Sequence, residues 1–314
     1  MDKESKILIV GHGGIIENSL TAHLQNNGFA RVSSSSKTSL NVFDQQEVQK
    51  FFTEQKPEYV FLASTRSGGI EANQKYAAEF IHSNLMSQNN IIHAAYENGV
   101  RKLLFLSSSC IYPKESPQPI KEEYLLGGPL EPTSEPYAMA KIAGIKMCQA
   151  YRQQYRFNAI VMIPATIYGP GSDVDIRTSH VLGALLGKFY DAVKNNEAEV
   201  VVWGTGKPRR EFLFVEDFIE AALFLMEKYD DSGIINAGYG SDVSIKELAG
   251  LIAKQLGFKG KVVFNDAMSD GAMQKLLDNT RISNLGWKAK VKLEEGIEKT
   301  YQWYEQLNQN GVMK

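Results

Sequence analysis

Ser108, Tyr137 and Lys141 are residues whose types and spacing suggest proton-transfer chemistry. Tyr137 and Lys141 lie in Glu135–Lys141, where Pro136 and the helix formers after it predict the start of a helix. Residues i and i+4 of a helix share one face. An ammonium ion beside a phenol favours the phenolate form, so such a tyrosine can exchange a proton with an alcohol near neutral pH.

The residues before Tyr137 and Lys141 distinguish this pair from a second Tyr-x-x-x-Lys pair in the chain. Lys102–Leu106 is an apolar run of strand length, and it ends in the serines of Ser107–Pro113. Tyr190 and Lys194 have no such strand and serine before them, which favours a solvated helix face. A serine after a strand, followed about 30 residues later by Tyr-x-x-x-Lys, resembles the short-chain dehydrogenase/reductase superfamily. That resemblance implies that the serine orients a carbonyl, the tyrosine donates a proton and the lysine also holds the nicotinamide ribose.

A glycine-rich turn near the N-terminus predicts a dinucleotide site. The apolar run Lys6–Val10 indicates a strand of a buried parallel sheet, and Gly11–Glu17 follows it directly. Glycines between a strand and a helix let backbone amides approach a pyrophosphate. Gly11 and Gly14 match the Gly-x-x-Gly-x-x-Gly pattern of extended short-chain enzymes, but Glu17 replaces the third glycine with a carboxylate that would repel a nearby pyrophosphate. An ordinary glycine-rich turn is the alternative interpretation.

The segment Ser33–Lys37 predicts the choice of dinucleotide. NAD-selective folds place an acidic residue about 20 residues past the glycines, on the ribose 2′-hydroxyl. Here no acid occurs between the glycine turn's helix and Asp44, whereas small hydroxyls and Lys37 are present. This composition favours the 2′-phosphate of NADP(H). A polar serine loop without a ligand role is the alternative.

Composition excludes several classes of function. The chain has 314 residues and a net charge of −2, which gives no electrostatic footprint for nucleic acid. Met1–Lys6 is neither a signal nor a transit peptide, and no apolar run approaches the roughly 20 residues that span a bilayer. The two cysteines, Cys110 and Cys148, argue against a disulfide framework or a metal site. We therefore expect a cytoplasmic protein without membrane, nucleic-acid or metal partners.

The order of predicted elements indicates an α/β fold. Strands and helices alternate through the first 110 residues, which predicts a Rossmann-type, doubly wound parallel sheet. We expect residues 1–170 to form the NADP-binding domain, with parts of 204–240 returning to it. Residues 171–314 have shorter elements and are expected to form mainly a smaller C-terminal α/β domain that binds the substrate.

Longer motifs make the resemblance more specific. The chain resembles the GDP-L-fucose synthase family over essentially its whole length, through the segments Ser107–Lys114, Glu131–Lys146, Ser179–Val181, Val201–Gly204, Arg210–Leu213, Lys275–Asp278, Leu285–Trp287 and Thr300–Trp303. That family epimerises C3 and C5 of GDP-4-keto-6-deoxy-D-mannose and then reduces the C4 ketone with NADPH. The resemblance implies Ser108, Cys110, Tyr137, Lys141 and His180 as catalytic residues. Cys110 and His180 would carry the protons of epimerisation, while Ser108 and Tyr137 bond O4. Cys148 is expected to be a buried structural residue.

The resemblance also implies the ligand contacts and the assembly. The cofactor is expected to contact Gly11, Gly13, Gly14, Ile15, Ile16, Lys37, Leu106, Ser107, Lys141, Pro164, Ala165, Ile167 and His180. The GDP moiety is expected to contact Lys188, Trp203, Arg210 and Asp278. A homodimer is expected through the long helices at roughly 76–98 and 136–155.

Some residues depart from the family pattern. Lys188 stands where bacterial members commonly have arginine, so a bidentate grip becomes a point charge. Thr166 replaces an asparagine, and Gly13 replaces an arginine that some relatives aim at the adenosine phosphate. These changes, with Glu17, concern ligand contacts more than the class of reaction.

Three other functions are compatible with parts of the pattern. One is a reductase or epimerase of another GDP-4-keto sugar, such as a heptose or a dideoxy sugar. A nucleotide-sugar dehydratase would carry an Asp-Glu pair where Ser109 and Cys110 stand. A cofactor-sensing binding protein on the same fold would be expected to lose the Tyr137–Lys141 pair.

Overall fold

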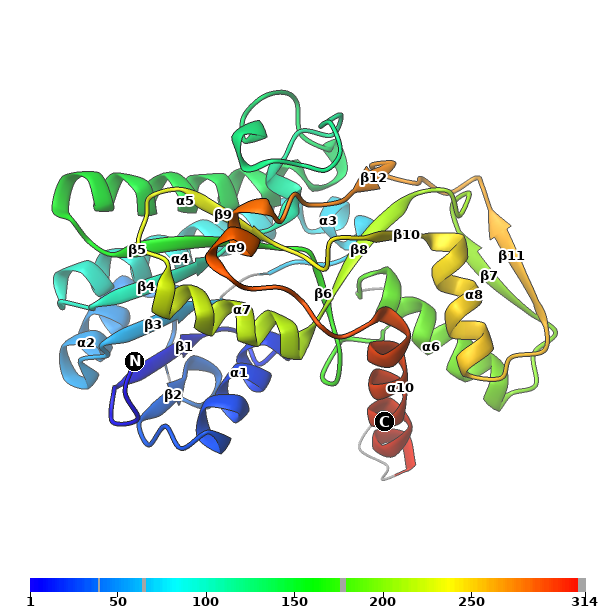
Figure 1. Cartoon of the computed structure of the whole chain (residues 1–314), viewed down its shortest axis with the longest axis horizontal. Coiled ribbons are helices and arrows are strands. Elements are labelled where there is room, and N and C mark those ends of the chain that lie inside the picture. Colours follow the sequence, from blue (N-terminus) through cyan, green and yellow to red (C-terminus); the bar gives the residue numbers. More distant parts are fainter. Residues whose placement is uncertain (39, 64–65, 176–178, 310–314) are drawn as a thin grey trace.

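A six-stranded parallel sheet forms the centre of the larger lobe (Figure 1). The computed structural model describes residues 1–38, 40–63, 66–175 and 179–309. The strand order is β2-β1-β3-β4-β5-β9. The strands are β1 (Ile7–Val10), β2 (Val32–Ser34), β3 (Tyr59–Leu62), β4 (Lys102–Leu106), β5 (Ala159–Pro164) and β9 (Ile234–Ala237). Every residue of β1, β4, β5 and β9 is buried, as expected for strands covered on both faces.

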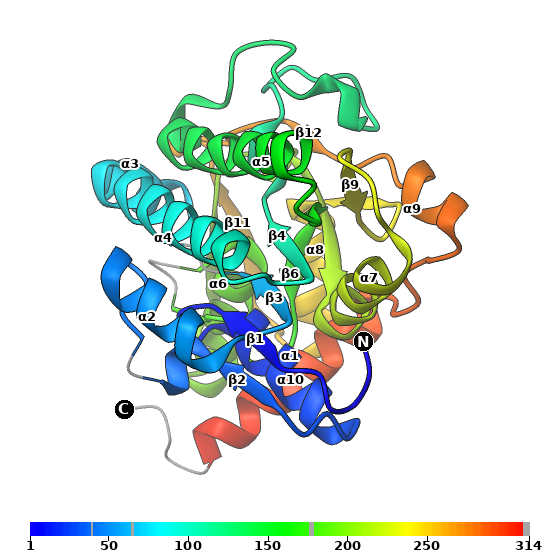
Figure 2. The same ribbon diagram turned by 90° about the vertical axis from the view of Figure 1, so that its left-hand side faces the viewer.

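Helices cover both faces of this sheet, which confirms the predicted doubly wound fold (Figure 2). The helices α1 (Ile15–Asn26) and α7 (Val215–Lys228) pack together on one face. On the other face lie α2 (Gln45–Gln55), α4 (Ala77–Glu97) and α5 (Glu135–Tyr155), with the short α3 (Ile70–Lys75) before α4. The α4–α5 pair is tied by Gln88, whose side-chain amide donates to the Ala140 carbonyl at 2.7 Å.

Shorter elements form the smaller lobe (Figure 1). The strands β6 (Thr166–Tyr168), β8 (Arg209–Phe214), β10 (Asp242–Ser244) and β12 (Gln274–Lys275) form one small sheet, and β7 (Glu199–Trp203) pairs with β11 (Lys261–Asn265). The helices here are α6 (Val181–Lys194), α8 (Ile245–Gln255) and α10 (Leu293–Gln309), whereas the short α9 (Thr280–Leu285) lies against β9 of the six-stranded sheet. A capping box begins α8: the Ser244 hydroxyl accepts from the Glu247 N–H at 3.1 Å, and the Ser244 N–H donates to the Glu247 carboxylate.

The second Tyr-x-x-x-Lys pair lies on α6 and does not line the cavity described below. Lys194 is exposed, as predicted. The prediction of a solvated face is wrong for Tyr190, because its ring packs edge-on against Tyr304 of α10 with 4.9 Å between the ring centroids.

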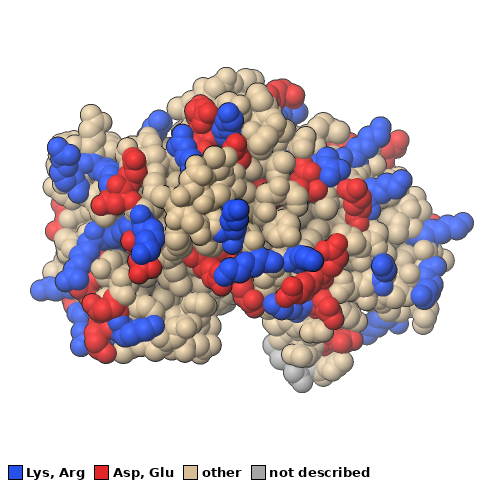
Figure 3. Space-filling view, viewed as in Figure 1, with Lys and Arg blue, Asp and Glu red and all other residues tan. Residues whose placement is uncertain are grey.

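Charged side chains of both signs are interspersed over the face seen in Figure 3. Within the described residues, no helix is long and apolar enough to cross a membrane.

Candidate active site

A large cavity of about 920 Å³ lies at the carboxyl ends of β1, β4 and β5. Its walls come from the glycine turn, the serine segment after β4, the start of α5, the start of α6 and strand β8. Ligands of open α/β sheets bind at this end of the strands. The fold therefore brings the glycine turn and the Ser108–Tyr137–Lys141 group to one cavity.

Lys141 is held in a buried position beneath the cavity. Its side chain is fully buried, its ammonium donates to the Leu106 carbonyl at 3.1 Å, and it lies 5.0 Å from the centre of the Phe105 ring. Burial lowers the pKa of Lys141 to about 7. Lys141 can therefore take up or release a proton near neutral pH. Tyr137, one helical turn earlier on α5, lines the same cavity.

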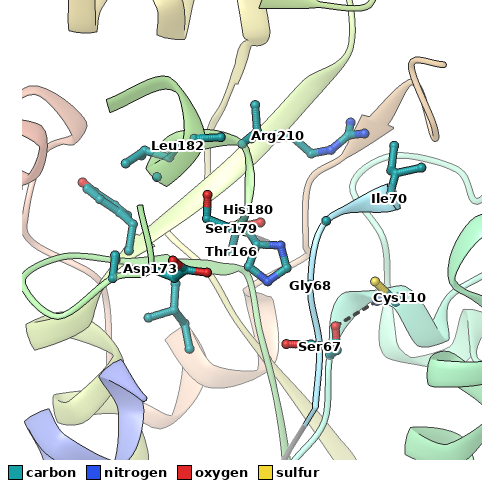
Figure 4. Close-up of a pocket in the computed structure, with 18 of the residues that line it drawn as sticks. Ser67, Gly68, Ile70, Cys110, Thr166, Asp173, Ser179, His180, Leu182 and Arg210 are labelled. Carbon is teal, nitrogen blue, oxygen red and sulfur yellow. Dashed lines mark hydrogen bonds between the residues drawn. The ribbon is translucent and has the colours of Figure 1, made fainter. Parts of the chain in front are cut away.

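Cys110 lies in the short turn Ser109–Ile111 that follows β4. Its backbone N–H donates to the Ser108 hydroxyl at 3.3 Å, and its sulfur lies 3.5 Å from the ammonium of Lys275 (Figure 4 shows the sulfur at the cavity). Burial by itself would raise the pKa of this thiol. The Lys275 charge and the hydrogen bonds from Ser108, Lys275 and Ser134 outweigh that effect and lower the pKa. Cys110 is therefore suited to act as a base.

Cys148 differs in each of these respects. It is completely buried within the core of the larger lobe, and burial raises its pKa to about 12. The expectation that Cys148 is structural agrees with this environment.

His180 caps the N-terminus of α6, and Figure 4 shows its ring directed into the cavity. The side chain has exposed surface within the cavity, yet the surrounding protein removes enough water to lower its pKa. Lys275 lowers this pKa further, and Asp173 opposes it. The protonated imidazole is thus a stronger acid than a histidine in water.

Three of the four predicted GDP contacts lie together in the smaller lobe. Lys188 donates to the Val201 carbonyl at 2.9 Å and sits 5.1 Å from the centre of the Trp203 ring, which is 45% exposed. Arg210 lines the same cavity, and burial lowers its pKa. A cation, an aromatic face and a guanidinium are groups that bind a pyrophosphate and a base.

Asp278 does not line the cavity; its carboxylate accepts from the Thr280 N–H at 2.8 Å. Asp270 does line the cavity and accepts from the Thr205 N–H and hydroxyl, both at 2.8 Å. Asp270 and Lys275 were not among the predicted site residues, although Lys275 begins one of the segments that resemble the family. The turn Gly204–Gly206, which contacts Asp270, was the available signal.

All but one of the predicted cofactor contacts line the cavity. They are Gly11, Gly13, Gly14, Ile15, Ile16, Leu106, Ser107, Lys141, Pro164, Ala165, Ile167 and His180. Lys37 is exposed and is not part of the lining. The buried Ser107 hydroxyl has no hydrogen-bond partner among the described residues, and a Cβ added at Gly14 would meet open space. An unpartnered hydroxyl and an open glycine at a helix N-terminus fit a dinucleotide.

Glu17 adds a feature that the glycine pattern does not contain. Its buried carboxylate accepts from the Gly13 N–H at 2.6 Å and from the Ser36 N–H at 2.9 Å, and lies 3.3 Å from the Ser35 hydroxyl. It therefore connects the glycine turn to the segment after β2.

A parallel sheet with a glycine turn at its first strand and a Ser-Tyr-Lys group at its carboxyl edge defines a dinucleotide-dependent enzyme of the short-chain type. The chain belongs to the NAD dependent epimerase/dehydratase family, whose model matches residues 7–238.

Relatives within this family are similar over almost their whole length. The chain is 48% identical to a putative GDP-L-fucose synthase 2 of Arabidopsis thaliana over 304 residues, which are 97% of this chain and 93% of the relative. It is 44% identical to the GDP-L-fucose synthase of Escherichia coli K12, over 96% of this chain and 97% of the relative. Among solved structures, a GDP-6-OMe-4-keto-L-xylo-heptose reductase from C. jejuni superposes with a TM-score of 0.93 at 37% identity, covering 98% of this chain and 99% of the other.

Proposed function

We propose that this protein is a GDP-L-fucose synthase that epimerises C3 and C5 of GDP-4-keto-6-deoxy-D-mannose and reduces C4 with NADPH. The observation that carries the proposal is that Cys110 and His180 line the same cavity as Ser108, Tyr137 and Lys141. One cavity thus contains two proton carriers for epimerisation and a proton donor for ketone reduction. The similarity to the curated synthases supports the same substrate.

Epimerisation requires proton transfer on both sides of the sugar ring. The C4 ketone acidifies the hydrogens on C3 and C5, and removing one of them places negative charge on O4. Cys110 is the base, because its lowered pKa favours the thiolate. His180 returns a proton to the opposite face of the same carbon as a general acid. Ser108 and Tyr137 donate hydrogen bonds to O4 and stabilise the enolate.

Reduction of the C4 ketone uses Tyr137 and Lys141. The dinucleotide supplies the hydride when bound. Tyr137 gives its phenolic proton to O4, and Lys141, one helical turn away with its pKa of about 7, can supply a proton in turn. Lys141 would also hold the ribose of the dinucleotide. The choice of NADPH is supported by a relative from Campylobacter jejuni, 39% identical, whose structure is described with NADP bound.

The GDP moiety is assigned to the smaller lobe. Trp203 offers an exposed ring face to the base, and Lys188 and Arg210 offer positive charge to the pyrophosphate. The proposed division is residues 1–170, with β9 added, for NADP, and mainly residues 171–314 for the nucleotide sugar. Two free cysteines support a reducing, cytoplasmic location.

A substrate comparison tests the proposal. The enzyme is incubated with NADPH and either GDP-4-keto-6-deoxy-D-mannose or a GDP-4-keto-heptose, and the product is compared with authentic GDP-L-fucose. We expect GDP-L-fucose and a larger kcat/KM for the deoxymannose. Turnover of the heptose alone would support the second candidate, a C4 reductase, which the similarity to heptose reductases favours. Absence of turnover with both substrates would contradict both candidate functions, the synthase and the C4 reductase.

A homodimer through α4 and α5 is also proposed. These helices pack along each other, and α5 exposes Met139 and Tyr155, at 46% and 44% of their surfaces. Light scattering should give about twice the 35.0 kDa of one chain. A stable species at the mass of one chain would contradict the dimer.

A further inference from the structure

Lys275 comes from a part of the chain far from the serine segment, yet it meets Cys110. It ends β12, which runs parallel to β8 and places Lys275 beside Arg210 in register. Its ammonium lies 3.5 Å from the Cys110 sulfur. We propose that Lys275 is a positioning residue that keeps Cys110 as a thiolate directed into the cavity. This inference rests on the proposed function, in which Cys110 carries a proton.

The residues that follow Lys275 are fixed by hydrogen bonds to two other parts of the chain. The Leu276 N–H donates to the Gln118 side chain and the Leu277 N–H to the Glu211 carboxylate, both at 2.9 Å. The Ile120 N–H donates to the Leu276 carbonyl at 2.7 Å. Glu211 is itself buried, so this link is shielded from water. The backbone that carries Lys275 is therefore held in place, and the ammonium is directed to the Cys110 sulfur.

Other charged or polar groups also face Cys110. Arg210 of β8 is close enough to interact electrostatically with the thiol, but Asp270 and Glu131 offset part of its charge. Ser108 lies on the same turn and Ser134 precedes α5. Among the described residues, Lys275 has no ion pair with a carboxylate, and its hydrogen bond goes to the sulfur. Lys275 is thus the cation whose charge remains most available to the thiolate.

The Lys275 charge also lowers the pKa of His180. A positive charge favours the deprotonated form of both groups, which makes the thiol a more abundant base and the protonated imidazole a stronger acid. Lys275 would therefore favour Cys110 as the base and His180 as the acid.

Alkylation of the thiol tests this inference without any substrate. The full-length protein is treated with iodoacetamide between pH 5 and 10, and modification of Cys110 is followed by mass spectrometry of its peptide. Because only the thiolate displaces iodide, the rate reports the deprotonated fraction. For the wild type we expect a midpoint below the ordinary value near 8.5. For Lys275→Met we expect the midpoint to rise by about one pH unit or more and the rate at pH 7 to fall roughly tenfold.

Two variants control the comparison. Lys275→Arg keeps the charge and should retain a midpoint close to that of the wild type. Lys114→Met removes a cation from the same segment as Cys110, but this lysine pairs with Glu131 at 3.2 Å, so the midpoint should not change. Cys148 is buried and should stay unmodified in each folded variant, which also reports correct folding. If Lys275→Met is unfolded, the less apolar Lys275→Gln replaces it.

If Lys275→Met or Lys275→Gln has the same alkylation midpoint as the wild type, the assignment of Lys275 is overturned. An equal shift of the midpoint in Lys114→Met would overturn it too. Either result would leave the synthase activity to be judged by its own assay. Conversely, a shifted midpoint in a protein that does not convert the sugar would support the Lys275–Cys110 contact while contradicting the proposed function.

Discussion

The two ends of the cavity follow the family pattern to different degrees. At the catalytic end, Ser108, Cys110, Tyr137, Lys141 and His180 all line one space. At the other end, where the adenosine of the cofactor is expected and which we call the adenosine end, Glu17 replaces the third glycine of the pattern. Its carboxylate is buried between the glycine turn and the segment after β2. The residues that would perform the reaction are retained, whereas those that would hold the far end of the dinucleotide have changed.

The contacts of Glu17 explain how the protein accommodates this change. A buried carboxylate is costly unless hydrogen bonds compensate it, and here two backbone N–H groups and a serine hydroxyl surround it. Gly11 is needed as well, because a Cβ at that position would overlap the Glu17 side chain. An internal network thus occupies amides that could otherwise face a phosphate. The catalytic end of the cavity can therefore keep the residues of the family pattern while the contacts of the glycine turn change.

The largest expected effect is the loss of ketone reduction when a residue of the catalytic end is replaced. Tyr137→Phe should lower the rate of ketone reduction by roughly 10²–10⁴-fold, because it removes the proton donor, and should leave the NADPH dissociation constant nearly unchanged. Steady-state kinetics and a fluorescence titration measure the two quantities. Tyr190→Phe is the matched control, since Tyr190 belongs to the same spacing but packs on α10. Near wild-type turnover of Tyr137→Phe would remove this residue from the mechanism.

A smaller effect is expected at the adenosine end. Glu17→Gly should tighten NADPH binding by about tenfold, which corresponds to about 1.4 kcal/mol, because it removes a negative charge and frees the Gly13 amide. Glu17→Gln tests the charge with the shape retained. Calorimetric titration gives both dissociation constants. Values equal to that of the wild type in both variants would show that the carboxylate does not act on the cofactor.

The smallest effect should come from Lys37. We expect NADPH to be preferred to NADH, since Ser33–Lys37 contains no acid and one cation. Lys37 is exposed and outside the cavity lining, so Lys37→Met should weaken that preference only a few-fold. The ratio of kcat/KM for the two cofactors measures it. Equal efficiencies in the wild type would refute the predicted preference.

Local sequence patterns predicted the parts of the site that depend on local structure. The doubly wound sheet followed from buried strands alternating with helices, and the proximity of Tyr137 and Lys141 from one turn of α5. Lys275 was missed because it reaches the cavity only when β12 pairs with β8, and Asp270 was missed because it is held by Thr205, 65 residues earlier in the chain. The network of Glu17 was missed for the same reason, since Ser35 and Ser36 approach it only when β2 joins β1.

The central claim is that Cys110 and His180 give this cavity an epimerase activity in addition to reduction. Incubation with GDP-4-keto-6-deoxy-D-mannose and NADPH in D₂O, followed by NMR of the product, measures it most directly. We predict deuterium at C3 and C5 and the L-galacto configuration, and we expect Cys110→Ser to lose both while any remaining reduction gives an uninverted product. Reduction by the wild type without deuterium at either carbon would contradict the account.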